Sequence, residues 1–571
     1  MKQKKMKARA TAIAIFCLAI MLVVSACSKN ENAGSSPSES AASPAAESAG
    51  ASPSTSAANE DGPWTKYEQP LKVTTALSTN TGITQLGSDT YDDNLWTREI
   101  ESTFNIQMQN LWTADATQFK TKLNVSIASG ELPDVFTVDN VQFAQVNASG
   151  LVADLTEAYE KFASPELKRI MESDTAGFES GRVDGKLMGI SAQHFGMISI
   201  PSVVWIRDDW MKKFNLAPPT TMDELLHMAE VFTTQDPDGN GKNDSYGIAI
   251  NKNLYDTSLA ATGVALADGI LNAYHAYPAA WIKDASGKIV YGSVQPEMKA
   301  GLAVLQDMYK KGLISKEFGL KDTAKIAEDL TNNKVGIEIG SNWNGFYPGP
   351  DIIKKNGVEA ILMPYAIPSA DGKPVMQPGS WPVGAYVVAN KKFANPEAVI
   401  KLINLYVKLN LTNDGEQYTN FNAGGRAWLS PVSVNDPEQS TREYTQISEA
   451  LKTKDTSKLT ASSVGKYEQA LMWEQSKDPD GVGGWLQNSS VGSFSVLQKL
   501  FDEGRVLPTE YRGIDTPTMA EKKATLEKLE KETITKIIMG ASLDEFDKMV
   551  DSWNKLGGEA ITKEMNELYN K

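Results

Sequence analysis

Cysteine and histidine are nearly absent from this chain of 571 residues. The two cysteines are Cys17 and Cys27, and the three histidines, far apart in sequence, are His194, His227 and His275. Without paired histidines, a catalytic zinc site is not expected. Without any cysteine after Cys27, the rest of the chain can form neither a disulfide nor a thiolate metal site.

Motifs typical of catalysis are also missing, because the sequence contains no GxSxG, HExxH or P-loop pattern. Its 71 acidic residues do not exclude a pair of catalytic carboxylates, and Asp208 and Asp209 are adjacent in WIRDDW. These two stand at a predicted junction from strand to helix, so we interpret them as helix-capping residues. Trp205 and Trp210 of the same stretch are interpreted as packing residues. We name no catalytic residue.

Positive charge is scarce relative to negative charge. The formal net charge is −15, although the first 26 residues contain basic residues and no acidic one. The remainder is therefore more acidic than the whole chain. Such a surface argues against nucleic acid or anionic lipid as the main partner, and we predict no nucleic-acid binding.

The N-terminus reads as a targeting segment. A basic start leads into the apolar run ATAIAIFCLAIMLVVSA, which is short for a membrane span. Ser25 and Ala26 before Cys27 resemble a bacterial lipobox, in which the cysteine is lipidated and becomes the new N-terminus. We interpret residues 1–26 as a lipoprotein signal peptide; an ordinary signal peptide is the alternative. Residues 27–63, rich in Ser, Ala and Pro, are predicted to be a flexible tether.

From Trp64 onward, strand patterns alternate with helix patterns, which predicts α/β layers with a mostly parallel sheet. The predicted strands include residues 71–78, 131–139, 202–210, 334–343 and 383–390. The predicted helices include residues 92–105, 119–130, 144–162, 221–235, 296–312, 395–410, 518–540 and 543–558. Within the helix at 221–235, Thr221 is the expected N-cap.

The stretch QDPDGNGKND (residues 235–244) has the spacing of a calcium loop. Oxygen ligands at positions 1, 3, 5, 7 and 9 of an EF-hand-like loop are predicted from Asp236, Asp238, Asn240, the carbonyl of Lys242, and Asp244. Position 12 is Gly247 and not the usual Glu, and a predicted strand follows. We therefore expect a structural Ca²⁺ site and not a sensor. A solvated, Asx-rich turn is the alternative.

Several segments together resemble the extracellular solute-binding proteins of carbohydrate ABC importers. They include SGELPDVFTVDN, VDGKLMGIS, VVWIRDDWMKKFNLAPPTTMDELLHMAEVF, NNKVGIEIGSNW, ANPEAVIKLINLYV and TITKIIMGASLDEFDKMVDSWNKLGG. Within that family, the chain resembles the large lipoproteins of Gram-positive bacteria that serve oligosaccharide importers, and it is similar to the alginate oligosaccharide-binding proteins. The resemblance implies a type 2 periplasmic-binding-protein-like α/β fold, with two lobes, crossing segments at a hinge and a ligand cleft between the lobes. It implies lobe 1 at residues 64–191 and 378–513, and lobe 2 at residues 192–377 and 514–571.

Sugar binding needs flat aromatic rings for stacking and planar polar groups for hydroxyls. The residues that we predict to contact ligand are Trp343, Trp381, Asp139, Asn140, His194, Phe195, Asn342 and Arg426. Trp343 matches the place where maltose-binding relatives offer a cleft tryptophan, and Asn342 and Asn344 flank it. The others lie at a predicted strand end, at the predicted crossings, or in the Gly-rich loop FNAGGRAW.

The sequence thus predicts a monomeric receptor without enzymatic activity, held at the outer face of the cell membrane by lipid on Cys27. It would capture an oligosaccharide and deliver it to an ABC permease. A tethered glycan-degrading hydrolase or lyase and a polysaccharide-binding adhesin are the alternatives. The sugar stays open between an acidic uronate oligomer and a neutral oligosaccharide. The acidic class needs a cationic contact, for which the candidates are Arg98, Arg182, Arg207 and Arg426.

Overall fold

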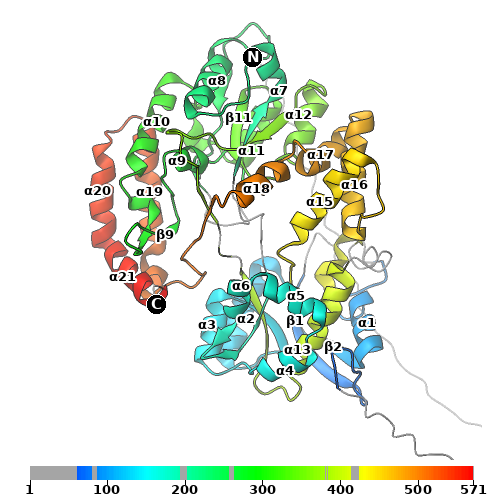
Figure 1. Cartoon of the computed structure of the whole chain (residues 1–571). Coiled ribbons are helices and arrows are strands. Elements are labelled where there is room, and N and C mark those ends of the chain that lie inside the picture. The colour runs from blue at the N-terminus through cyan, green and yellow to red at the C-terminus, as the bar shows by residue number, and fades with distance from the viewer. Residues whose placement is uncertain are drawn as a thin grey trace, which may run out of the picture. The chain divides into compact units, whose positions relative to one another are not determined.

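The computed structural model describes residues 61–79, 87–192, 202–255, 263–379, 381, 383–412 and 423–569 (Figure 1). Residues 61–571 form one compact unit. The predictions for the signal peptide, Cys27, nearly all of the tether, His194 and Phe195 lie outside the described residues. Within the described part, no helix combines the length and the apolar character that crossing a membrane requires.

The first lobe contains two small sheets. In one, β1 (Leu71–Thr79) pairs in parallel with β2 (Ile106–Asp115), and α1 (Leu95–Phe104) joins them. In the other, β14 (Ala385–Ala389) lies between β3 (Val135–Asp139) and β6 (Ile190–Ser191) and runs antiparallel to both. The prediction of a mostly parallel sheet is therefore wrong here, because β14 comes from a remote part of the chain and needs no crossover helix.

One predicted helix of this lobe is divided. The range 144–162 forms α3 (Asn140–Ala148) and α4 (Thr156–Phe162), not a single helix. Gly150 between them has a φ of +62°, a left-handed conformation that ends α3. The remaining elements of the lobe are α2 (Ala116–Ser129), α5 (Pro165–Ser173), α6 (Thr175–Glu179), β4 (Arg182–Val183), β5 (Lys186–Leu187) and α13 (Glu397–Tyr406).

The second lobe is built around a four-stranded sheet. Its strand order is β12 (Leu362–Tyr365), β7 (Val203–Arg207), β11 (Val335–Gly340) and β8 (Tyr246–Ile248), and only the β8–β11 pair is parallel. Both faces are covered. Val204 and Ile206 of β7 belong to one apolar cluster, whereas Val203 and Trp205 belong to another, as the alternation of side chains along a strand requires.

Helices of the second lobe cover both faces of this sheet (Figure 1). Thr221 caps α8 (Met222–Thr234) through a capping box with Glu224, which confirms the predicted cap. The other elements are α7 (Asp208–Lys213), α9 (Asp268–Ala273), β9 (Trp281–Lys283), β10 (Ile289–Tyr291), α10 (Met298–Lys311), α11 (Thr323–Thr331) and α12 (Gly349–Asn356). The C-terminal helices α19 (Pro517–Ile538), α20 (Asp544–Trp553) and α21 (Glu559–Tyr569) pack on the cluster that contains Val204.

Residues 439–507 differ from the lobe assignment expected from the sequence. They form α15 (Gln439–Thr453), α16 (Ala461–Ser476), α17 (Val482–Asn488), α18 (Ser493–Asp502) and β15 (Val506–Leu507). Leu486 and Leu497 share an apolar cluster with Trp205 of the second-lobe sheet. The expected return to lobe 1 over residues 378–513 therefore holds only as far as about Val434, which packs with the first lobe. The apolar faces of α17 and α18 find their partner in the second lobe.

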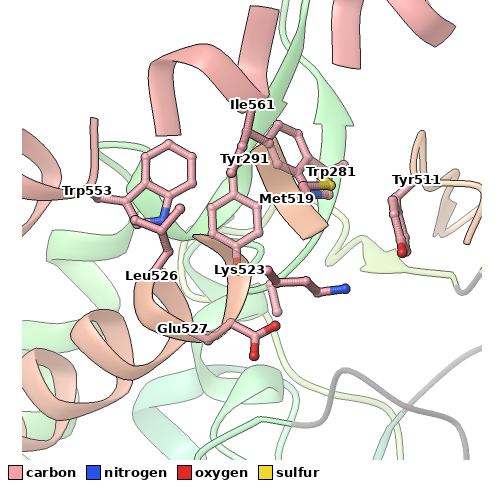
Figure 2. Close-up of a pocket in the computed structure, with 10 residues that line it drawn as sticks. Trp281, Tyr291, Tyr511, Met519, Lys523, Leu526, Glu527, Trp553 and Ile561 are labelled. Carbon is pink, nitrogen blue, oxygen red and sulfur yellow. The ribbon is translucent and has the colours of Figure 1, made fainter. Parts of the chain in front are cut away.

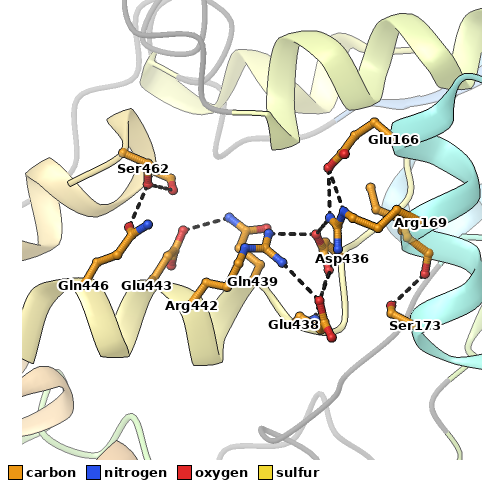
Figure 3. Close-up of polar contacts among 12 residues, drawn as sticks. Glu166, Arg169, Ser173, Asp436, Glu438, Gln439, Arg442, Glu443, Gln446 and Ser462 are labelled. Atoms are coloured by element: carbon orange, nitrogen blue, oxygen red, sulfur yellow. Dashed lines mark hydrogen bonds and ion pairs between the residues drawn. The ribbon is translucent and has the colours of Figure 1, made fainter. Parts of the chain in front are cut away.

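A charged cluster marks the point where the chain leaves the first lobe (Figure 3). The carboxylate of Asp436 accepts hydrogen bonds from Arg169 of α5 and Arg442 of α15. Burial alone would raise the pKa of Asp436, but the hydrogen bonds from Arg442 and Arg169 hold it below its ordinary value. Glu166 and Glu438 also pair with Arg169. We call these five residues the Asp436 cluster.

Candidate ligand-binding site

Two of the segments that pass between the lobes run side by side. β13 (Gln377–Pro378) pairs in parallel with β15, with Gln377 opposite Val506 and Pro378 opposite Leu507. Because of this register, the residues that follow the two strands lie close together. Trp381 and Arg512 meet there, with the guanidinium carbon of Arg512 lying 5.6 Å from the ring centre of Trp381.

Tyr569 of α21 contributes a second ring to this group. The Arg512 guanidinium lies 5.5 Å from the ring centre of Tyr569, so aromatic rings from two remote segments contact one cation. Trp381 packs partly buried against the apolar cluster of the first lobe, and Arg512 is exposed. We call Trp381, Arg512 and Tyr569 the crossing cluster. The predicted contact residue Trp381 is thus placed at a crossing, but Arg512 already contacts its ring.

Asp139 and Asn140 lie close to this cluster in the first lobe. Asp139 caps α3 by accepting from the backbone of Gln142 at 2.8 Å, and it pairs with Lys120 at 2.7 Å. The amide nitrogen of Asn140 donates to the Val383 carbonyl at 2.9 Å, while its Oδ1 atom is buried without a partner among the described residues. A Cβ atom on Gly513 would lie 2.2 Å from that amide nitrogen, so Asn140 touches the segment that carries Arg512.

Trp343 is half-buried in a turn that follows β11. Its two asparagine neighbours are structural rather than open to a ligand. Asn342 accepts from Gln487 at 3.2 Å and, through its carbonyl, from Ser493 at 2.6 Å. Asn344 is buried and donates to the Gly263 carbonyl at 3.1 Å. Of these three residues, Trp343 is the one that is not fully buried.

Glu338, which the sequence reasoning did not select, supports the Trp343 turn from within β11. It is fully buried and accepts from the side chain of Asn344 and from the backbone of Ala265, both at 2.9 Å. Burial raises its pKa to about 7, against the lowering effect of these two hydrogen bonds. Among the described residues, no cation pairs with this carboxyl group. The signal in the sequence was a single acidic residue inside the apolar stretch VGIEIG.

The four arginines that we predicted as cationic contacts for a ligand interact with other parts of the protein. Arg98 pairs with Asp89 and Asp93, and Arg182 pairs with Glu179. Arg207 is buried and pairs with Asp209 at 2.6 Å. Arg426 lies in a short helix at Ala423–Leu429, where its carbonyl accepts from Trp96 at 3.0 Å. The structure does not bring Arg426 to the crossing cluster.

Asp208 and Asp209 are not the helix caps that we predicted. The N-cap of α7 is Arg207, and the two aspartates lie in the first turn. Asp208 pairs with Lys212 at 2.6 Å, and Asp209 pairs with Arg207. Negative charge at this position interacts favourably with the helix dipole, so both aspartates have a structural role.

An aromatic cavity of about 120 Å³ lies in the second lobe against the C-terminal helices (Figure 2). Its wall includes Trp281, Tyr291 and Trp553, with Tyr291 and Trp553 stacked at 5.3 Å. Figure 2 shows the Lys523 side chain extending toward Tyr511, and its ammonium lies 5.0 Å from that ring. This volume is smaller than the roughly 300–1,000 Å³ of ordinary ligand pockets. The cavity is therefore too small to hold an oligosaccharide alone.

The predicted calcium loop is closed by its own hydrogen bonds. Asp238 and Asp244 both accept from the side-chain nitrogen of Asn240, at 2.8 and 3.2 Å, and Asp236 accepts from the backbone of Asn240 and Gly241. The hydrogen bond from the backbone of Gly241 lowers the pKa of Asp236, although desolvation opposes this effect. Among the described residues, no three His, Cys, Asp or Glu side chains are gathered as a metal site. The side-chain oxygen atoms of the loop are of the types that bind Ca²⁺. In this structure, however, they are arranged around the amide groups of Asn240.

Comparisons with known proteins identify the family. The family model described as bacterial extracellular solute-binding protein matches residues 110–408, more than half of the chain. The chain belongs to this family. The match includes β3, β7, β11 and β14, the strands that form the centres of both lobes.

Individual relatives agree with this assignment. The Bacillus subtilis protein named polygalacturonan/rhamnogalacturonan-binding protein YtcQ is 23% identical over 482 residues, covering 83% of this chain and 87% of the relative. An HMO-binding, ABC-transporter-associated solute-binding protein from Bifidobacterium longum infantis has a TM-score of 0.61, with 17% identity, over 88% of this chain and 98% of that one. The alginate-binding protein AlgQ2 without calcium ion has a TM-score of 0.55, with 17% identity, over 88% and 99%. These likenesses confirm the predicted fold and the predicted similarity.

Proposed function

We propose that this protein is the receptor of an ABC importer, which captures an oligosaccharide in the cleft between its lobes and delivers it to the permease. The observation that carries the proposal is the pairing of β13 and β15, beside which an exposed cation contacts one aromatic ring from each lobe. A solute that contacts both lobes stabilises their closed arrangement. The names of the relatives, which include carbohydrate ligands, support the sugar class.

A thermal-shift screen of defined oligosaccharides tests this function. A ligand that binds only the folded protein stabilises it by about 2.7 kcal/mol at 100 times its Kd, which raises the melting temperature. We expect at least one acidic or neutral oligosaccharide of three to five sugars to produce such a shift. If none does, while a peptide library does, the receptor carries a different class of solute.

The protein is proposed to leave its ligand unchanged, and we name no catalytic residue. The test is incubation of the purified protein with the bound oligosaccharide, followed by assays for new reducing ends and for unsaturated products. Release of the intact sugar supports the receptor. Turnover would support the alternative of a glycan-degrading enzyme. Binding confined to long polymers, without binding of short oligomers, would support an adhesin.

We also propose the cellular context that the sequence predicts. The N-terminal residues direct export, lipid on Cys27 anchors the protein at the outer face of the membrane, and the receptor acts as a monomer. Metabolic labelling with a fatty-acid analogue tests the anchor, with Cys27→Ser as the variant that should lose the label. Sedimentation of the lipid-free protein tests the oligomeric state.

Ca²⁺ is the proposed structural ion of the loop at residues 236–244. Asp236, Asp238, Asn240, Asp244 and the carbonyl of Lys242 would hold it, and the bound ion would neutralise the three carboxylates and fix the end of α8. Chelation with EDTA should then lower the melting temperature, and added Ca²⁺ should restore it. Asp238→Asn should abolish this response. An equal melting temperature with and without EDTA contradicts the proposal.

A further inference from the structure

Arg512 differs from six other arginines of the described part of the chain. Arg98, Arg169, Arg182, Arg207, Arg442 and Arg505 each form an ion pair with a carboxylate. Arg512 forms none with any described residue, and its contacts are the rings of Trp381 and Tyr569. A guanidinium stays protonated at every physiological pH, so this exposed positive charge is permanent.

The acidic neighbours of Arg512 are paired with other residues. Glu510 interacts with Lys283 at 3.6 Å. Asp515 accepts from Lys523 at 3.1 Å and from the hydroxyl of Tyr511 at 2.7 Å. The segment 510–515 therefore contains two carboxylates and still leaves its arginine without one. In a chain with a formal net charge of −15, a cation without a carboxylate partner among the described residues is unusual.

The contacts of Arg512 with the two rings leave its hydrogen-bond donors unused. A guanidinium carries five N–H donors, which lie in its plane and point outward. No N–H group of Arg512 donates to a described residue. A planar fork of this kind matches a carboxylate, which it binds through two parallel hydrogen bonds. The rings also restrict the side chain, so less entropy is lost when a partner binds.

The guanidinium of Arg512 lies beside residues of both lobes. Trp381 comes from the first lobe, Tyr569 comes from α21 on the second, and Gly513 touches Asn140. A ligand group at Arg512 would thus lie beside residues of both lobes. The unpartnered Oδ1 atom of Asn140 offers a nearby acceptor for a hydroxyl group once the site opens.

We infer that Arg512 is a specificity-determining residue for an acidic oligosaccharide, and that its guanidinium binds the carboxylate of a uronate unit while Trp381 and Tyr569 hold it in place. The inference rests on the proposed function and narrows its ligand to the acidic class. Neutral oligosaccharides would lack the two charge-assisted hydrogen bonds and would bind more weakly. Affinity for the acidic ligand would also fall as ionic strength rises.

Isothermal titration with matched sugars tests the inference. The probes are a galacturonic-acid trimer, an alginate trimer, and a neutral galactose trimer. We expect tight binding of at least one acidic trimer by the unmodified protein. Arg512→Gln should weaken that binding about 10- to 100-fold, the effect of losing charge-assisted hydrogen bonds. Arg512→Lys should weaken it less, because the charge stays and the planar fork is lost.

Arg98→Gln is the matched control, because Arg98 is exposed but paired with Asp89 and Asp93. It should leave the affinity for the acidic trimer unchanged. Melting temperatures of the ligand-free variants show that each one folds. Binding of the neutral trimer alone would overturn the inference and leave the proposed function intact. Equal affinity of Arg512→Gln and the unmodified protein for the acidic trimer would also overturn it. Binding of no sugar by a folded protein overturns both.

Discussion

The Asp436 cluster and the crossing cluster differ in the groups that surround their arginine side chains. In the Asp436 cluster, two guanidinium groups surround one buried carboxylate, and further acids pair with their outer edges. In the crossing cluster, one guanidinium contacts two aromatic rings and no carboxylate of the described chain. The first arrangement is complete without a partner and joins two parts of the fold. The second leaves its cation without a carboxylate among the described residues, and in our inference the ligand supplies one.

Removal of the Asp436 carboxylate should have the largest effect on stability. Asp436→Asn leaves two guanidinium groups facing a neutral amide, and loss of one member of a buried pair costs about 3–5 kcal/mol. Because the arginines are partly exposed and can be hydrated, we expect the lower end of that range. Urea denaturation at pH 7 measures the change in the free energy of unfolding. A loss below about 1 kcal/mol would show that the cluster is not structural.

The pH dependence of the stability of Asp436→Asn is a second test of the structural role of the cluster. The pKa of Asp436 is lowered in the folded protein, so its stabilising contribution is present above the unfolded-state pKa and is lost as pH falls through the folded value. The destabilisation caused by Asp436→Asn should therefore shrink at strongly acidic pH. Glu438→Gln is the control, since Glu438 is exposed and its pairs with Arg169 and Arg442 contribute little.

Glu338 is a second ionisable group without a partner of opposite charge among the described residues. Unlike Arg512 it is buried, and its replacement should stabilise the protein. Its pKa is raised from 4.5 to about 7, so the folded protein loses stability as pH rises from about 4.5 to about 7. Glu338→Gln removes that loss, and we expect a gain of up to about 3 kcal/mol at pH 8. At pH 4, below the unfolded-state pKa, the gain should nearly vanish. Thermal unfolding at both pH values, with Glu468→Gln as an exposed control, measures the difference.

The opposite result would be informative about the Trp343 turn. If Glu338→Gln lowers stability at pH 8, the carboxylate form of Glu338 is needed to hold Asn344 and Ala265. Ligand affinity should then fall with stability. A stabilised variant with unchanged affinity would instead show that the turn keeps its place with a neutral residue in β11.

The sequence allowed accurate prediction of features that depend on local residues. The helix with the Thr221 cap and the buried strand around Val335 were both expected. The break between α3 and α4 was missed, because apolar periodicity continues past Gly150. The lobe of α17 and α18 was missed because an amphipathic helix does not specify which apolar surface covers it.

The candidate site was only partly predictable for the same reason. Trp381 was selected because it lies at a crossing, and the structure places it there. Arg512 was not selected, because its proposed role depends on the three-dimensional structure, in which no described carboxylate pairs with it. Asn342 and Asn344 were selected for their chemistry, yet both are used by contacts to remote residues such as Ser493 and Gly263. Pairing between distant residues decides which polar groups remain available.

Neutralising one arginine from each cluster should separate their roles. Arg169→Gln removes one of the two guanidinium groups on Asp436, and we expect a loss of about 1–3 kcal/mol in unfolding free energy. Arg512→Gln removes cation–π contacts at an exposed site, which are worth about 0.5–1 kcal/mol each. Its loss should therefore be smaller, and it should be the variant that loses the acidic ligand. Equal effects on stability would contradict the distinction between the clusters.

The smallest expected effect comes from giving Arg512 a partner within the chain. Lys523→Met frees Asp515, which then competes with ligand for the Arg512 guanidinium and should weaken binding of the acidic trimer about 2- to 5-fold, as expected for an exposed ion pair. Adding Asp515→Asn to this variant should restore the affinity, because the competing charge is gone. Isothermal titration at low ionic strength resolves the difference. If Lys523→Met binds as tightly as the unmodified protein, or if the double variant stays weak, Asp515 does not reach Arg512 and the isolation of that charge has another cause.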